Sequence, residues 1–188
     1  MKVAKTIRTI TTAPIMAAIL LTLVWQFNPG SYPTTVHYLM AMLFLAILPV
    51  LAYPVSVIVP SIRHQGREGQ RKLAIMFSVA GYIGGIIFCL ITHAYGAELL
   101  IYLTYFISGI LIALFSFAIK FKASGHACGV SGPIAMLIHL LGPIYALGYI
   151  LLAVVFWASI KLKRHTWPQL IGGSVIPVIT MLILISVL

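Results

Sequence analysis

Acidic residues are nearly absent from this 188-residue chain: Glu68 and Glu98 are the two acids, against twelve lysines and arginines. Charged residues of both signs make up 7% of the sequence and hydrophobic residues 62%, which excludes an ordinary soluble domain. Cysteines are also few, and Cys89 and Cys128 are isolated in or beside apolar runs, which favours buried thiols over a zinc site or a disulfide framework. A chain this short and apolar is expected to form one membrane domain over residues 1–188.

The N-terminus is basic and then apolar, as in a secretory signal peptide. However, no small-x-small cleavage site followed by a polar mature region is present, and residues 28–30 lead directly into another apolar run. The first apolar segment is therefore expected to be retained as a helix.

Seven apolar runs approach the roughly 20 residues that cross a bilayer. They are residues 9–27, 36–59, 73–95, 97–119, 126–141, 143–160 and 167–188. Because backbone groups in hydrocarbon must be hydrogen-bonded within their own segment, these runs are expected to be helices. The predicted fold is all-α, a polytopic membrane bundle of seven helices, or of six if the first lies along the membrane surface.

The loops between these runs alternate in charge. With seven crossings, all twelve lysines and arginines fall on one side, and the opposite loops, at residues 28–35, 96 and 142, contain none. The positive-inside rule assigns the basic side to the cytoplasm. A phosphate site would also collect cations there, so topology and chemistry both remain explanations of the pattern.

Two histidines open helices from the basic side, within the sequences KASGH at residues 122–126 and KLKRHTWPQ at residues 161–169. A histidine beside lysine and arginine at a membrane edge is typical of a site that handles phosphate. Because the fifth and sixth runs go out and back, His126 and His165 are predicted to return to the same face. His139 lies thirteen residues beyond His126, about 20 Å along a helix, so it is not expected in the site.

These elements resemble the signatures of the type 2 phosphatidic-acid phosphatase family, which contains integral-membrane and related soluble acid phosphatases. The resemblance covers roughly residues 54–177. Residues 124–126 match the family's Ser-Gly-His element, and His165 with Gln169 matches its His-x3-Asp element, in which some members place glutamine. Residues 54–77 match its first basic stretch loosely.

The resemblance implies phosphoryl transfer through a phosphohistidine. His165 would be the nucleophile and His126 the general acid. Gln169, four residues after His165, would orient its ring. The phosphate would be bound through side-chain charge and the free N–H groups at a helix start, by Arg71, Lys72, Lys122, Ser124, Gly125 and Lys161. No metal or other cofactor is expected.

One position departs from the family pattern. The family has an arginine six residues before the nucleophilic histidine, where this chain has Ser159. Serine has neither the positive charge of a guanidinium nor its ability to donate two parallel hydrogen bonds to a phosphate. Lys161, Lys163 or Arg164 could compensate, although Arg164 adjoins His165 and should point to a different face.

Two functions of different classes follow from these residues. The first is a membrane lipid phosphatase acting on a lipid phosphate or a polyprenyl diphosphate. The alternative is a catalytically impaired family member that binds or helps move anionic phospholipid. Expected partners are the substrate and membrane lipids, without nucleic acid. The expected location is the cytoplasmic membrane of a prokaryote, with the basic face and the site towards the cytoplasm.

Overall fold

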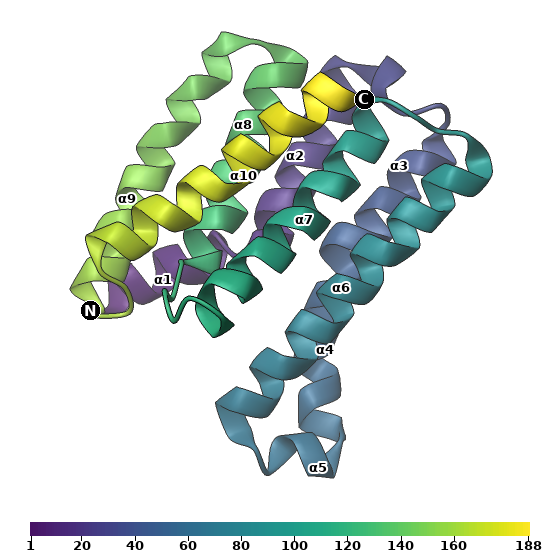
Figure 1. The fold of residues 1–188 in the computed structure, drawn as a ribbon. Coiled ribbons are helices and arrows are strands. Elements are labelled where there is room, and N and C mark those ends of the chain that lie inside the picture. The colour runs from purple at the N-terminus through teal and green to yellow at the C-terminus, as the bar shows by residue number, and fades with distance from the viewer.

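The computed structural model describes the backbone of residues 1–188 and every side chain except those of Arg67, Arg71 and Phe117. All regular secondary structure in this described chain is helical, and Figure 1 shows the helices side by side in a bundle. The helices are α1 (Lys2–Ile10), α2 (Ala13–Phe27), α3 (Thr35–Met42), α4 (Leu48–Ile58), α5 (Pro60–Arg63), α6 (Gly66–Thr92), α7 (Ala97–Phe117), α8 (Gly125–Leu141), α9 (Gly148–Lys161) and α10 (Trp167–Val187). Short 3₁₀ turns lie at η1 (Pro29–Ser31) and η3 (Pro143–Leu147), and a π-helical turn, η2 (Leu43–Ile47), joins α3 to α4.

The prediction of an all-α membrane bundle is confirmed. Five helical segments are long and apolar enough to cross a membrane: Thr35–Ile58, Glu68–Thr92, Ala97–Ser116, Pro143–Lys161 and Trp167–Val187. The pair α1 and α2 passes the same test as a sixth, bent segment, and α8 is a shorter apolar helix of 17 residues. Each of the seven predicted runs overlaps one of these segments.

The first predicted run, residues 9–27, differs most from the structure. The chain is already helical from Lys2, breaks after Ile10 and starts again at Ala13. Pro14 explains the restart, because proline lacks an N–H and fits only the first turn of a helix. α1 leaves the direction of α2 by 49° and packs on α9, with its lysines exposed, as expected of a helix along the membrane surface.

α8 lies at the centre of the bundle although it is short. Its residues from Gly129 to Leu137 are all buried, and it packs mainly against α10 and α2. Small residues let these backbones approach closely: a Cβ added at Gly129 would lie 3.1 Å from the Cα of Ala13. The first turn of α8, which carries His126, is therefore held by helices on both sides.

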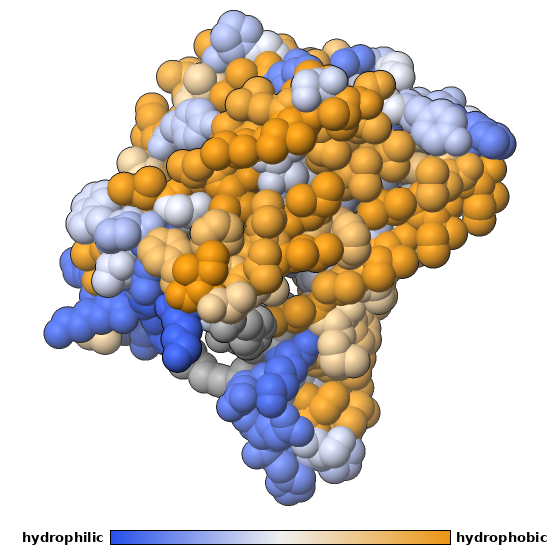
Figure 2. Space-filling view, viewed as in Figure 1, coloured by the Kyte–Doolittle hydropathy of each residue, from blue (hydrophilic) through white to orange (hydrophobic). Residues whose placement is uncertain are grey.

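The basic segments gather at one end of the molecule. In Figure 1, α1, the loop before α8, the turn between α9 and α10, and α5 all lie at the lower end, while η1, the turn after α6 and η3 lie at the upper end. Figure 2 shows hydrophobic side chains over the middle of the visible face and strongly hydrophilic ones below it. Together with the first two turns of α6 and the last residue of α9, these segments carry all twelve lysines and arginines, as the alternation of the loops predicted.

A buried polar pair lies towards the opposite end. Nδ1 of His37 in α3 is 2.7 Å from Oε2 of Glu98 in α7, and these side chains are only 8% and 2% exposed. Within the described atoms, Glu98 Oε1 and the hydroxyls of Tyr32 and Tyr102 are buried without a partner. This contact links α3 to α7. Removing either side chain would leave the other polar group buried without a partner, which is costly.

We expect His37→Ala to lower the free energy of unfolding by about 3–5 kcal/mol, because it leaves Glu98 buried without its partner. Glu68→Ala is the matched control, since it removes the exposed pair that Glu68 forms with Lys72 at 3.2 Å and should cost less than about 0.5 kcal/mol. Unfolding in mixed micelles, followed by circular dichroism, measures both. Equal losses in the two variants would contradict this account.

Candidate active site

His126 lies in the first turn of α8, whose start is fixed by Ser124. Ser124 is the N-cap residue, and its Oγ accepts the N–H of Ala127 at 3.2 Å. Such a cap satisfies one of the amides that a helix start leaves unpaired. The Ser124 side chain is thus buried and occupied as a cap, whereas Gly125 is exposed at the same helix start.

His165 lies in the turn between α9 and α10. α9 ends in a Schellman motif, in which the N–H of Arg164 donates to the carbonyl of Ser159 at 3.0 Å and the N–H of Lys163 to that of Ile160 at 2.9 Å. Lys163 takes the left-handed conformation that this motif requires, with φ of 53°. The chain reverses within these few residues, which places His165 directly before the start of α10.

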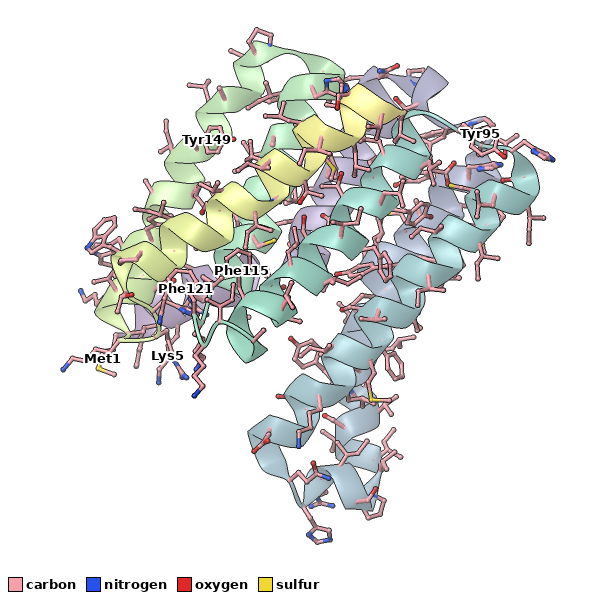
Figure 3. The ribbon with its side chains drawn as sticks, in the orientation of Figure 1. Met1, Lys5, Tyr95, Phe115, Phe121 and Tyr149 are labelled. Carbon is pink, nitrogen blue, oxygen red and sulfur yellow. The ribbon has the colours of Figure 1, made fainter. Side chains whose placement is uncertain are left out.

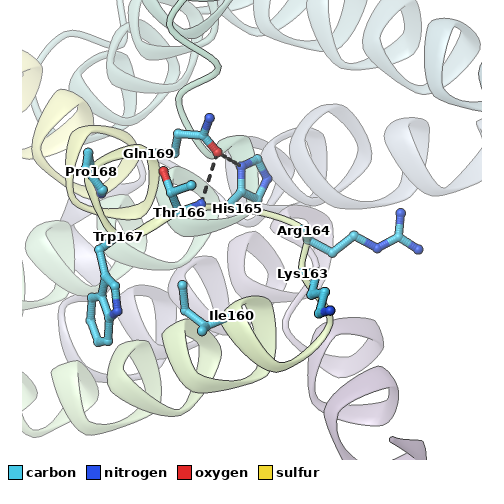
Figure 4. A pocket seen from close by; sticks show the side chains of 8 residues that line it. All are labelled: Ile160, Lys163, Arg164, His165, Thr166, Trp167, Pro168 and Gln169. Carbon is cyan, nitrogen blue, oxygen red and sulfur yellow. Dashed lines mark hydrogen bonds between the residues drawn. The ribbon is translucent and has the colours of Figure 1, made fainter.

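Gln169 orients His165 at the start of α10. Thr166 and Gln169 form a capping box, and Gln169 Oε1 accepts the N–H of Thr166 at 3.2 Å. The same oxygen lies 3.2 Å from Nδ1 of His165 (Figure 4). Because an amide oxygen only accepts, Nδ1 is the donor, and the lone pair of the neutral ring is on Nε2. This is the contact that the four-residue spacing predicted.

The two histidine-bearing helix starts are joined through their backbones. The N–H of Ser124 donates to the carbonyl of Gln169 at 2.9 Å. One turn further along α10, a Cβ added at Gly173 would lie 2.8 Å from the nitrogen of Ser124 and 2.9 Å from its carbonyl carbon. This close approach holds both histidines at one end of the bundle.

The N-terminal helix α1 completes this region. Thr11, at its end, has Oγ1 3.0 Å from Nε2 of His126 and donates to the carbonyl of Ile7 at 2.7 Å. Because the hydroxyl has one proton, the histidine is the donor in the other contact. Arg8 Nη1 donates to Ser159 Oγ at 2.6 Å. Sequence analysis missed both residues; their three-residue spacing on one helix face is the signal that could have pointed to them.

The other predicted phosphate-binding residues lie elsewhere or make other contacts. Nζ of Lys161 lies 4.8 Å from the ring centroid of Trp157 on the exposed surface of α9. Lys72 is exposed and pairs with Glu68 within the first two turns of α6. Lys122 is exposed in the loop before α8. The side chain of Arg71 lies outside the described residues.

The structure therefore assembles a subset of the predicted site. The residues it brings together are Ser124, Gly125, His126, His165 and Gln169, joined by Arg8, Thr11 and Ser159. Among the described side chains no three metal-ligating residues gather, so no metal centre is found in them.

An open depression of about 500 Å³ lies over the turn between α9 and α10. Figure 4 shows His165 and Gln169 together on one part of its lining, with the Arg164 side chain extending away from them, as predicted. Both acids of the chain are engaged elsewhere, Glu98 with His37 and Glu68 with Lys72. The lining combines the apolar Ile160, Trp167 and Pro168 with basic and polar residues, and no carboxylate of the described side chains lies in it.

Comparison with known proteins finds no matching protein family, no matching curated protein and no matching solved structure. The phosphatidic-acid phosphatase family therefore stays a prediction from the sequence motifs of this chain.

We expect Gly173→Ala to destabilise the protein by about 1–3 kcal/mol, because the added Cβ overlaps the Ser124 backbone. Gly109→Ala is the matched control in α7, where the Cβ would be 3.6 Å from the Tyr82 ring and should stabilise the helix by about 0.5–1 kcal/mol. Thermal unfolding in detergent measures both variants. A Gly173→Ala protein as stable as Gly109→Ala would show that α8 and α10 are not held at this contact.

Proposed function

We propose that this protein is a membrane phosphatase of the phosphatidic-acid phosphatase type, which hydrolyses a lipid phosphate or a polyprenyl diphosphate. The observation that carries the proposal is the hydrogen bond from the Ser124 N–H to the Gln169 carbonyl, 2.9 Å long, which joins two histidine-bearing helix starts. Each histidine is also oriented by a neighbour, His165 by Gln169 and His126 by Thr11.

The proposed chemistry divides phosphate release into two displacements. In the first, the Nε2 lone pair of His165 attacks phosphorus and the bond from phosphorus to the lipid oxygen breaks. His126, protonated beside the bound phosphate anion, gives its proton to that oxygen. In the second, His126 takes a proton from water, the resulting hydroxide oxygen bonds to phosphorus, and the N–P bond breaks. Inorganic phosphate leaves and both imidazoles return to their starting states.

The orientation of His165 supports its role as the nucleophile. Gln169 accepts from Nδ1, which leaves the lone pair on Nε2 in the neutral ring. After attack, the ring carries a positive charge shared with Nδ1, and the amide oxygen of Gln169 stabilises that charge through the same hydrogen bond. A neutral partner at this position gives less stabilisation than the carboxylate of the family pattern would.

The membrane supplies the substrate in this proposal. The phosphate would lie at the basic end, and the apolar chain would run beside α10, where the large side chains of Trp167 and Ile171 are 58% and 52% exposed. Anionic lipids are drawn to this end by about 1 kcal/mol for each nearby lysine or arginine. The positive-inside rule would place it at the cytoplasmic face of a prokaryotic membrane.

We expect His165→Ala and His126→Ala each to lower phosphate release from a short-chain phosphatidic acid in detergent at least about 100-fold, the scale of a lost acid–base group. His139→Ala is the matched control, because His139 is exposed near the end of the same helix α8 and away from the site. Phosphate release by the purified variants, at matched folding, is the measurement. Full activity in either of the first two variants would end the assignment.

The alternative, a protein that binds or helps move anionic phospholipid without cleaving it, is favoured by Ser159 at the place of the family's arginine. The same assay separates the two functions. A phosphatase releases phosphate from phosphatidic acid or a polyprenyl diphosphate, whereas the alternative predicts binding to vesicles that contain phosphatidic acid with no release from either lipid.

A further inference from the structure

We infer that α1 is part of the phosphate site, and that Arg8 binds the phosphate oxygens of the substrate beside His126 and His165. This inference rests on the proposed function for the identity of the full substrate, but not for the binding of phosphate itself. It gives the N-terminal helix a role in substrate binding that the sequence did not predict.

The first observation is the burial and the hydrogen bonding of the Arg8 guanidinium. Arg8 is half-buried between α1 and α9, and its Nη1 donates to a neutral partner, Ser159 Oγ, at 2.6 Å. A guanidinium has five N–H donors, so this bond uses only one of them. A cation removed from water is stabilised when an anion accepts its remaining donors. The two acids of the chain form pairs elsewhere, so a bound anion has to come from outside the protein.

A second cation lies near the first. Burial lowers the pKa of Arg8, and the positive charge of Arg164 lowers it further. Both residues also meet at Ser159, whose carbonyl accepts the N–H of Arg164 and whose hydroxyl accepts from Arg8. Two cationic residues at one place, without a carboxylate from the described side chains, form a binding place for an oxyanion. Phosphate has several oxygens that can accept from both groups and relieve the repulsion.

The third observation is convergence on the histidines. Arg8 bonds the hydroxyl of Ser159, whose carbonyl accepts the N–H of Arg164, the residue directly before His165. One turn along α1 from Arg8, Thr11 bonds the His126 ring at 3.0 Å. One short helix thus brings a phosphate-binding cation to the site and holds the proposed general acid in place.

Ser159 explains why the cation can come from α1. Its carbonyl accepts the Arg164 N–H of the Schellman motif, and its hydroxyl holds the guanidinium of Arg8. A small side chain at this position leaves room for a guanidinium that enters from another helix. The family pattern has an arginine at position 159, and in this protein the guanidinium of Arg8 lies beside that position instead.

The experiment compares variants that separate charge from anchoring. Arg8→Gln keeps a long polar side chain and removes the charge, and Ser159→Ala removes the anchor but keeps the guanidinium. Arg8→Gln/Ser159→Arg returns a guanidinium to the same place from α9. Lys5→Gln is the matched control, because Lys5 is an exposed cation on the same helix.

Each purified full-length variant is assayed for hydrolysis of short-chain phosphatidic acid and for binding of inorganic phosphate by calorimetry. We expect Arg8→Gln to lower kcat/KM about 100- to 1,000-fold, the cost of removing one charge-stabilising group, and to weaken phosphate binding. Ser159→Ala should lose much less, the double variant should recover at least tenfold over Arg8→Gln, and Lys5→Gln should stay near wild type.

Several results would overturn the inference. Arg8→Gln with kcat/KM within threefold of wild type, or with unchanged phosphate binding, would reduce Arg8 to a packing contact. Equal losses of kcat/KM in Arg8→Gln and Ser159→Ala would mean that Arg8 acts only as an anchor for α1. The same conclusion would follow if Arg8→Gln fails to fold while the double variant folds but is inactive. If wild type binds phosphate in an Arg8-dependent way but releases none from lipid, the inference stands and the proposed hydrolysis fails.

Discussion

The backbones of α8 and α10 meet at Ser124 and Gly173 with no side chain between them, and the hydrogen bond from Ser124 to the Gln169 carbonyl closes this contact. Both histidines lie within a few residues of it. A slip of either helix by one residue is about 1.5 Å, whereas a reactive constellation tolerates about 0.5 Å. Packing at Gly173 therefore determines whether the two imidazoles can cooperate, in addition to its effect on stability.

The course of the chain through the bundle was predictable because a membrane span is a local property. Hydropathy identified the long apolar helices, and the lack of cations in alternate loops identified the end of the bundle to which each loop belongs. The break between α1 and α2 was missed, although Pro14 is visible in the sequence, because the apolar run continues across it. The pairing of His37 with Glu98 was also missed, because 61 residues separate the partners.

The same distinction between local and distant contacts explains which residues of the candidate site could be predicted from the sequence. His126, His165 and Gln169 could be predicted as site residues because each lies in a short motif, and the contact between His165 and Gln169 spans only four residues. Arg8 and Thr11 reach their partners across 151 and 115 residues, so only the tertiary packing of α1 reveals them. Nearness in sequence to a histidine does not place a flexible side chain towards it, and Nζ of Lys161 lies over the Trp157 ring.

The scarcity of acidic residues leaves most cations at the basic end of the bundle without a carboxylate that could pair with them. A carboxylate near Arg8 would hold the guanidinium in an internal ion pair, and a substrate phosphate would have to displace it. Glu98 is instead buried against His37 towards the opposite end, and Glu68 is paired with Lys72 on the surface of α6. In the proposed phosphatase, the basic end therefore keeps its charge available to lipid headgroups. Adding an acid there would weaken substrate binding even if it strengthened the fold.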